Sequence, residues 1–466
     1  MRGYPRRVVP DRQIWLNQDM NSPSAPGAMS AEIDLLIRPE WIIPIEPAGT
    51  TLSGHALAVN DGNILALLPH EEAMQRFRPR RTVELPGQVV LPGLINLHTH
   101  AAMSLLRGYA DDLPLMRWLS ERIWPAEARH AGPDFVRAGT LLACAEMLRG
   151  GITTFNDMYF FPDAAAEAAR RVGMRAVLGI VVIEFPTGYA ADADDYLARG
   201  LAARDALSDD PLLSFCLAPH APYTVADKTF DKIATLAAQL EIPVHVHLHE
   251  TAHEIEESLK QHGVRPVERM RRLGLLGPQL IAGHCVHLDA GEIDLLAHEG
   301  CHIAHCPTSN LKLGSGIAPV SAMQSRGLNF GLGTDGAASN NRLDLFQEMR
   351  HAALLAKGAS QDAESLDAHA SLHAATLGGA RALGLDERIG SLLPGKAADL
   401  CAVRLDEWLV QPCFDPASHL VYVAGREQVT HTWVKGELVM SAGVPVQIGI
   451  SELLDITGLW HTRLTS

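Results

Sequence analysis

The stretch from Val89 to His100 reads VVLPGLINLHTH, and it predicts a metal site at the end of a buried strand. The apolar run from Val89 to Leu97 has the length and the branched side chains of such a strand. His98 and His100 stand two residues apart, so the pleat of a strand places both imidazoles on one face. Two such nitrogens can bind a divalent transition metal. Because a lone His-x-His pair is often incidental, the prediction depends on partners elsewhere in the chain.

Further apolar segments follow this stretch and alternate with helical segments rich in Ala, Leu and Arg. The eight candidate strands are Val89–His100, Gly151–Asp157, Ala176–Ile183, Leu212–His220, Pro243–His249, Leu280–His287, His302–Pro307 and Asn329–Asp335. Several of them carry a potentially reactive side chain at the C-terminal end: His100, Asp157, His220, His247, His284 and Asp335. Active sites of (β/α)₈ barrels lie at that end of the strands. The pattern therefore predicts an α/β protein with a TIM-type metallo-barrel.

Both ends of the chain have a different sequence pattern, with short β-branched runs broken by Gly, Asn and Pro. Between Ile33 and Val90 we expect antiparallel strands, including a hairpin turn at residues 60–63. A similar pattern near the C-terminus predicts one small β-sandwich domain made from both chain ends. The expected organisation is a disordered extension at 1–28, sandwich strands at 29–89, the barrel at 90–392, further sandwich strands at 393–448 and a C-terminal tail at 449–466.

The net charge of −15 argues against nucleic acid and anionic membranes as partners, because no basic phosphate-binding surface is implied. No apolar run reaches the roughly 18 residues of a membrane span, and residues 1–28 lack the apolar core of a secretory signal. The seven cysteines form no C-x-x-C pair, which is typical of reduced thiols. We therefore expect a cytoplasmic protein with a small-molecule ligand. We also expect it to form a homo-oligomer, either a dimer or a tetramer.

The fifth predicted strand supplies a third histidine ligand. His245, His247 and His249 alternate along it and are expected on one face, and Glu250 follows them. His247 is the best candidate because Glu250 can lean back over a metal from the strand end, whereas His245 lies deeper and suits a core position. Glu250 could instead be an ordinary charge at a helix start.

Asp335 ends an apolar strand, where a buried carboxylate is costly without a cation or hydrogen-bond donors. Together His98, His100, His247 and Asp335 make a His₃Asp set that leaves a position open for water. Zinc suits this set, and iron(II) is the alternative.

At the level of whole motifs, the chain resembles the amidohydrolase superfamily, in particular its methylthioadenosine/S-adenosylhomocysteine deaminase branch, which is related to the triazine chlorohydrolases. The resemblance covers roughly residues 33–443. It is carried by LPGLINLHTHAAMSLLRG, the IWPAE of Ile123 to Glu127, APHAPYT, HVHLHET, GHCVHL, CPTSNLKLGSGIAPV and GTDGAASNN. Many related barrels bridge a second metal with a modified lysine after the fourth strand. His220 stands there in this chain, so we expect one metal.

The resemblance implies a role for each site residue. Metal ligands are His98, His100, His247 and Asp335, catalytic residues are Glu250, His284 and Asp335, and substrate-binding residues are Glu127, His220 and Glu250. Glu127 is expected to accept hydrogen bonds from ribose hydroxyls, and its alternative is a surface carboxylate in the helix near Pro125. Glu250 is expected to protonate the ring nitrogen beside the attacked carbon, while Asp335 and His284 orient the attacking water and accept its proton.

The implied function is hydrolytic deamination of an adenosine-type nucleoside. The expected arginines for the amino-acid tail of S-adenosylhomocysteine are not evident, since Phe185 to Pro211 contains only Arg199 and Arg204. We therefore favour 5′-methylthioadenosine as substrate, with S-adenosylhomocysteine or adenosine as further possibilities. A first alternative is deamination or dechlorination of a triazine, or deamination of guanine, which would leave Glu127 without a ribose diol. A non-catalytic barrel is a second alternative, but it would be expected to lack ligands.

Overall fold

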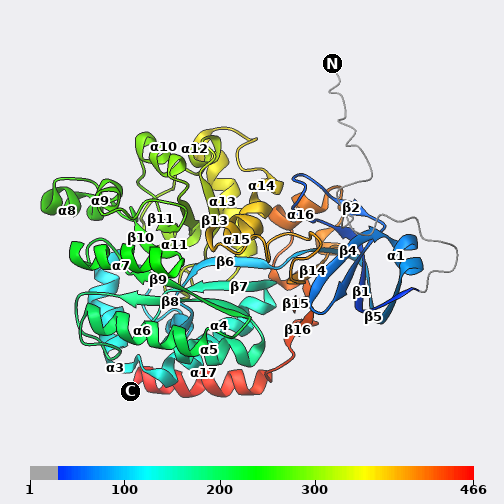
Figure 1. Cartoon of the computed structure of the whole chain (residues 1–466), viewed down its shortest axis with the longest axis horizontal. Coiled ribbons are helices and arrows are strands. Elements are labelled where there is room, and N and C mark those ends of the chain that lie inside the picture. The colour runs from blue at the N-terminus through cyan, green and yellow to red at the C-terminus, as the bar shows by residue number, and fades with distance from the viewer. Residues whose placement is uncertain (1–29) are drawn as a thin grey trace.

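The computed structural model describes residues 30–466, so the predicted extension at 1–28 lies outside the described residues. The chain forms two bodies (Figure 1): an eight-stranded barrel of parallel strands and a nine-stranded mixed sheet built from both chain ends. The predicted fold, a (β/α)₈ barrel with a second β domain shared by the two ends, is confirmed.

The barrel strands follow one another in chain order around the barrel. Their bounds are β6 (Leu94–Thr99), β7 (Ile152–Asp157), β8 (Arg175–Val182), β9 (Leu213–Pro219), β10 (Val244–Leu248), β11 (Leu280–His284), β12 (His302–His305) and β13 (Asn329–Leu332). The first and last strands are joined near their C-terminal ends, where the Asp335 N–H, just after β13, donates to the carbonyl oxygen of His98 in β6 at 2.9 Å. That contact brings two predicted metal ligands from opposite ends of the barrel sequence together.

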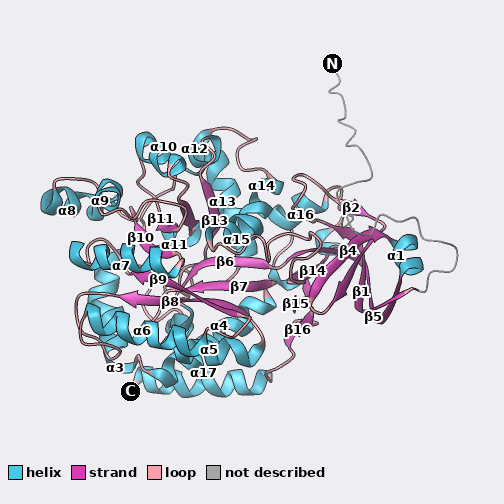
Figure 2. Cartoon of the chain, in the orientation of Figure 1, coloured by secondary structure: helices cyan, strands magenta, loops and turns pink. Residues whose placement is uncertain are grey.

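Helices surround the barrel strands on the outside (Figure 2). In chain order they are α2 (Leu115–Trp118), α3 (Trp124–His130), α4 (Pro133–Arg149), α5 (Pro162–Val172), α6 (Ala193–Leu207), α7 (Asp227–Leu240), α8 (Ala252–His262), α9 (Pro266–Arg272), α10 (Ala290–His298), α11 (Pro307–Lys312), α12 (Val320–Ser325), α13 (Leu345–Ser360), α14 (Ala368–His373) and α15 (Gly379–Ala382). A 3₁₀ turn at Ala101–Leu106 and π turns at Leu119–Ile123 and Ala374–Gly378 complete this part of the chain. Their apolar faces cover the barrel, as the alanine-rich buried face of α5 illustrates.

The second sheet runs in the order β17-β16-β15-β14-β5-β1-β3-β4, with β2 paired to β1. Its strands are β1 (Ala31–Ile42), β2 (Leu52–Ser53), β3 (His55–Asn60), β4 (Asn63–Pro69), β5 (Phe77–Pro92), β14 (Leu400–Arg404), β15 (Val429–Val434), β16 (Glu437–Ser441) and β17 (Val444–Pro445), with the short helices α1 (His70–Arg76) and α16 (Pro416–Tyr422). The predicted hairpin at residues 60–63 joins β3 to β4. The expectation of antiparallel strands throughout is wrong, because β1 and β5 pair in parallel. The intervening hairpin and α1 form a connection long enough for parallel pairing.

The stretch that predicts the metal site is not one strand. Residues 89–92 complete β5 in the mixed sheet, and residues 94–99 form β6 in the barrel. The change of sheet occurs at Gly93, where a Cβ atom would lie 2.1 Å from Thr153 Oγ1, so only glycine fits. On either side, the Gly93 N–H donates to the Asp399 carbonyl and the Leu94 N–H to the Gly151 carbonyl, each at 2.9 Å. This crossing sets the position of His98 and His100 at the barrel mouth.

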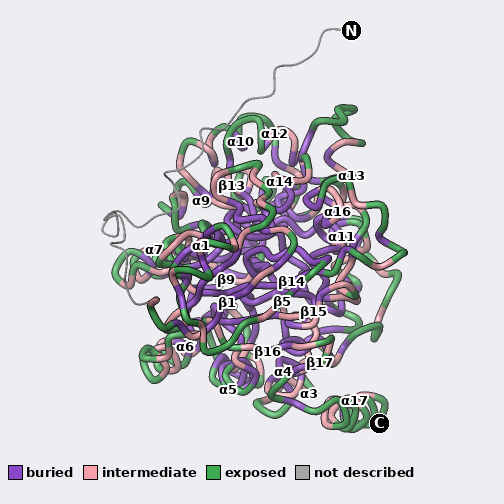
Figure 3. The backbone as a smooth tube through the Cα atoms, turned by 90° about the vertical axis from the view of Figure 1, so that its right-hand side faces the viewer, coloured by how far each residue is buried: buried purple, intermediate pink, exposed green. Residues whose placement is uncertain are grey.

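The predicted C-terminal tail is a helix, α17 (Ile450–Thr465), which lies at the surface of the molecule (Figure 3). It is attached through Trp460, which is buried and packs edge-on against Phe135 of α4 at a ring distance of 5.2 Å. Among residues 30–466, no helix combines the length and the apolarity needed to cross a membrane. The domain bounds drawn from the sequence stay predictions.

Candidate active site

Three imidazoles and one carboxylate meet at the C-terminal end of the barrel. His98 Nε2 lies 3.2 Å from His247 Nε2. Asp335 Oδ1 lies 3.3 Å from His98 Nε2 and 3.2 Å from His100 Nε2. Two overlapping sets of ligand atoms lie within 4.8 Å of one another, one from His98, His247 and His284 and the other from His98, His100 and Asp335. Strands from opposite sides of the barrel thus bring the four predicted ligands to one point.

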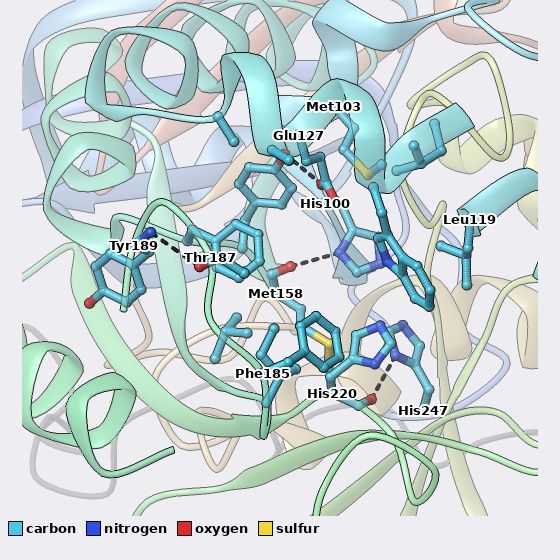
Figure 4. Close-up of a pocket in the computed structure, with 18 of the residues that line it drawn as sticks. His100, Met103, Leu119, Glu127, Met158, Phe185, Thr187, Tyr189, His220 and His247 are labelled. Atoms are coloured by element: carbon cyan, nitrogen blue, oxygen red, sulfur yellow. Dashed lines mark hydrogen bonds between the residues drawn. The ribbon is translucent and has the colours of Figure 1, made fainter. Parts of the chain in front are cut away.

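The Nδ1 atoms of two of these histidines are hydrogen-bonded to backbone carbonyl groups. His100 Nδ1 donates to the Met158 carbonyl oxygen at 2.7 Å, and His247 Nδ1 donates to the His220 carbonyl oxygen at 2.8 Å (Figure 4). Since a carbonyl can only accept, each Nδ1 carries a hydrogen, and in the neutral imidazole each Nε2 then directs a lone pair into the cluster. Closely spaced lone pairs around a carboxylate repel one another unless a cation lies among them. The residues present therefore fit a divalent metal.

Asp335 is held in one orientation by donors on both oxygens. The hydroxyls of Ser309 and Ser339 donate to Oδ2 at 2.6 and 2.7 Å, and the Gly336 N–H donates to Oδ1 at 2.8 Å. The residue has φ of 62°, a left-handed conformation that is rare outside glycine and is typical of functional sites. The serines occupy Oδ2 and leave Oδ1 directed at the histidines.

Glu250 and His284 lie beside the cluster. Glu250 Oε2 is 4.0 Å from His284 Nε2, and His284 Nδ1 lies 2.9 Å from Asn310 Oδ1. Burial raises the pKa of Glu250 above its ordinary value. A carboxyl group whose pKa is raised retains its proton closer to neutral pH, which suits a general acid.

A cavity of about 460 Å³ opens onto the cluster. Glu127, His220, Glu250, His284 and Asp335 all line it, and His98 is fully buried behind it. The remaining wall is mostly aromatic and aliphatic, with contributions from Trp118, Trp124, Phe160, Phe161, Phe185 and Tyr189. The structure thus brings every predicted site residue to one cavity or to the wall directly behind it.

Glu127 projects from α3 toward the cavity rather than toward bulk solvent (Figure 4). Its Oε1 accepts a hydrogen bond from the Tyr159 hydroxyl at 2.7 Å. Glu127 is only partly covered, because one side faces the cavity, but desolvation still raises its pKa to about 7. The surroundings of Glu127 therefore differ from those of the surface carboxylate considered as its alternative.

The other two histidines of the fifth barrel strand do not face the cluster in the same way. His245 is buried below it, and its Nδ1 accepts from Asn156 Nδ2 at 2.9 Å, as expected of a core histidine. The expectation that His249 shares their face is wrong, because β10 ends at Leu248 and His249 has φ of 55°. Its Nε2 accepts the Val267 N–H at 3.1 Å on the outer side.

Sequence reasoning missed the residues that hold the site residues in place. These are Tyr159, Ser309, Asn310 and Ser339. Ser309 and Asn310 belong to the CPTSN segment and Ser339 to GTDGAASNN, so matching motifs drew attention to them without indicating a contact. Tyr159 had no comparable signal.

The model of the amidohydrolase family matches residues 89–439, which span all eight barrel strands. The chain belongs to the amidohydrolase family. Within this amidohydrolase, the matched segment also includes every predicted metal ligand and catalytic residue.

Individual relatives cover nearly the whole chain. The 5-methylthioadenosine/S-adenosylhomocysteine deaminase of Teredinibacter turnerae is 44% identical over 435 residues, which are 93% of this chain and 98% of that protein. The protein of the same name from Syntrophobacter fumaroxidans is 45% identical over 426 residues, 91% of this chain and 97% of its own.

Solved structures agree with the fold. An adenosine deaminase from Xanthomonas campestris with bound zinc has a TM-score of 0.93 and 49% identity, covering 94% of this chain and all of that one. The atrazine chlorohydrolase of Arthrobacter aurescens, also with zinc, has a TM-score of 0.85 and 25% identity, covering 91% of this chain and 99% of its own. Zinc is thus the metal bound in both of these neighbours of the amidohydrolase described here.

Proposed function

We propose that this amidohydrolase is a zinc-dependent deaminase that hydrolyses adenosine-type nucleosides, with 5′-methylthioadenosine as the preferred substrate. The observation that carries the proposal is the placement of Glu127 in the cavity that contains the metal cluster and Glu250. One end of that cavity offers groups for hydrolysis, and its wall offers a hydrogen-bond acceptor in apolar surroundings. A nucleoside has the matching pair, a purine amine at one end and a ribose diol at the other.

His98, His100, His247 and Asp335 are proposed to hold one zinc ion. When bound, zinc lowers the pKa of a coordinated water toward about 7, which makes a hydroxide available near neutral pH. The separation of Asp335 Oδ1 from both His98 and His100 by only about 3 Å supports this ligand set.

The protein groups then have separate tasks. Glu250 donates its proton to the purine nitrogen beside the carbon that carries the amine, which makes that carbon more electrophilic. Asp335 and His284 orient the attacking water and accept its proton. A carbon–oxygen bond forms, and the proton that Asp335 and His284 accepted passes to the amine. The carbon–nitrogen bond then breaks to release ammonia, and the second proton of the water returns to Glu250 as the carbonyl forms.

Substrate recognition is assigned to Glu127 and His220. Because Tyr159 donates to Glu127 Oε1, the second oxygen is available to accept from ribose hydroxyls. His220 lines the cavity beside His247, at a ring distance of 4.9 Å, where it can contact the bound substrate. The aromatic wall suits the purine ring and an uncharged thioether.

Glu127→Ala should lower kcat/KM for adenosine-type nucleosides and leave any free base that is turned over unaffected. Each ribose hydroxyl buried without an acceptor is expected to cost about 1–3 kcal/mol. Steady-state kinetics with methylthioadenosine, adenosine and adenine would measure the effect. The matched control is Glu121→Ala. Glu121 is an exposed carboxylate on the preceding π turn, and it does not line the cavity. An equal loss with nucleosides and bases would contradict the ribose role.

Methylthioadenosine should exceed S-adenosylhomocysteine in kcat/KM by about tenfold, or roughly 1.4 kcal/mol of transition-state binding. Among the described residues that line the cavity, none is Arg or Lys that could bind a tail carboxylate. Arg199 lies 5.9 Å from the ring centre of Tyr189 at the cavity wall, but Asp195 already accepts from its Nε at 2.9 Å. Ammonia release from a nucleoside panel tests this prediction. Equal or reversed preference would contradict it, and charge-removing variants of Arg199 and Arg204 would identify the responsible group.

A free base or a triazine is the less favoured substrate, because it would leave the Glu127 carboxylate in the cavity without a ribose diol to bind. The atrazine chlorohydrolase and the guanine deaminase of E. coli are each 25% identical to this chain. A homo-oligomeric state, a cytoplasmic location and a single metal per chain stay predictions.

A further inference from the structure

The carboxylate of Glu254 accepts hydrogen bonds from the backbone at and just before Glu250. Oε1 accepts the His249 N–H and Oε2 accepts the Glu250 N–H, each at 2.9 Å. Glu254 is buried, with 5% of its surface exposed, and it belongs to the first turn of α8. Both carboxylate oxygens are therefore committed to the two residues that follow β10.

A simpler explanation is that Glu254 completes the start of its helix, since glutamate at the third helical position often does so. The same chain offers a direct comparison in α10. There Asp289 accepts the Glu292 N–H at 2.9 Å, and Glu292 Oε2 accepts the N–H of Asp289, the capping residue itself, at 3.0 Å. These two reciprocal bonds lie within the helix start, and the Glu292 carboxylate also accepts from Arg265 Nε and Nη2, each at 2.7 Å.

The start of α8 differs in the hydrogen bonds that its glutamate side chain accepts. Thr251 caps the helix by accepting the Glu254 N–H at 3.2 Å. Glu254 does not return a bond to Thr251 but reaches one and two residues further back, to Glu250 and His249. Its carboxylate thus holds the connection between strand and helix rather than the helix start.

That connection needs a restraint because His249 has φ of 55°, a conformation that is unfavourable for a side chain with a Cβ atom. The turn at His249 directs the Glu250 side chain toward the metal cluster. Without an acceptor, two buried N–H groups would be unsatisfied and the turn could relax to another conformation. Small displacements of a proton donor are costly in rate, since about 1 Å can correspond to about 10²-fold.

We infer that Glu254 is a positioning residue that acts through Glu250, an inference that rests on the proposed role of Glu250 as general acid. Glu250 lines the cavity, whereas Glu254 is not among the described residues that do so. Glu254 therefore affects the proton transfer without touching the substrate.

The test is a double-variant cycle on the full-length, metal-loaded protein, measured as ammonia release from methylthioadenosine. Glu254→Gln retains the size of the side chain, but its amide places an NH₂ group against one of the two N–H donors. We expect kcat to fall by about 10- to 100-fold, because Glu250 is displaced. KM should change by less than about threefold, since Glu254 does not reach the substrate.

The double variant Glu250→Gln/Glu254→Gln separates positioning from general damage. If Glu254 acts only through Glu250, its kcat should equal that of Glu250→Gln within about twofold. Further loss in the double variant, by the same factor as in the single one, would overturn the inference. So would near-wild-type kcat in Glu254→Gln. Should the Gln variant not fold, Glu254→Asp, whose shorter carboxylate cannot span both N–H groups, gives the same comparison.

Thr251→Ala is the matched control, because it removes the helix cap and leaves both backbone bonds of Glu254 in place. Its kcat should remain within about twofold of wild type, although a lost cap lowers thermal stability. A kcat as low as that of Glu254→Gln would show that the helix start matters and would overturn the inference. Failure of the proposed function would appear in the wild-type protein, whereas failure of this inference appears only in the variants.

Discussion

Replacing Glu250 with Gln should lower kcat by about 10²- to 10⁴-fold, the range typical of a lost general acid–base group. The amide has almost the same shape as the carboxyl group but cannot deliver a proton to the purine nitrogen. Metal content should be unchanged, because Glu250 is outside the proposed ligand set. Steady-state ammonia release and metal analysis on the same preparation would measure both quantities.

A control for this variant comes from α8, the helix that follows Glu250. Glu257 is on α8, pairs with exposed Lys260, and does not line the cavity, so Glu257→Gln should retain wild-type kcat. Retention of near-wild-type kcat by Glu250→Gln would mean that Glu250 is only a charge at the start of α8. The proposed mechanism would then need another acid.

Asp335→Ala should abolish both metal retention and turnover. Oδ1 approaches His98 and His100, and the whole carboxylate is held by Ser309, Ser339 and Gly336. Loss of this group would remove a proposed ligand together with a group that orients the attacking water. We expect about one metal per chain in the wild-type protein and a value near zero in the variant after dialysis, measured by elemental analysis.

Ser339→Ala provides a graded comparison at the same carboxylate. It removes one of two hydroxyl donors to Oδ2 and leaves the ligand itself in place, so a partial loss is expected. Outer contacts of this kind typically contribute about 10- to 100-fold in metal affinity or activity. Metal content near two per chain in active wild-type protein, or full metal and activity in Asp335→Ala, would contradict the single His₃Asp site.

The features of this protein that follow from local pattern can be predicted from the sequence alone. The two-residue spacing of His98 and His100 predicts that both imidazoles lie on one face of a strand. The eight apolar segments correspond to the eight barrel strands. The order of the strands put reactive side chains at one end of the barrel, because parallel strands share that end. The roles of these residues follow from the resemblance of whole motifs rather than from periodicity.

Other features depend on how distant parts of the chain pack together, and local pattern does not predict them. Periodicity does not reveal that the chain changes sheets at Gly93, which depends on the close approach of Thr153. Nor does it reveal the parallel pairing of β1 with β5, or the turn that takes His249 out of line with His247.

Local pattern also does not reveal the hydrogen bonds that orient the side chains of the site. Tyr159 reaches Glu127 across 32 positions of sequence, and Ser309 reaches Asp335 across 26. A repeating pattern states which side of an element is buried, and it extends only as far as that element. Which two buried groups face each other depends on how separate elements pack, so hydrogen bonds between elements are absent from any local reading of the chain.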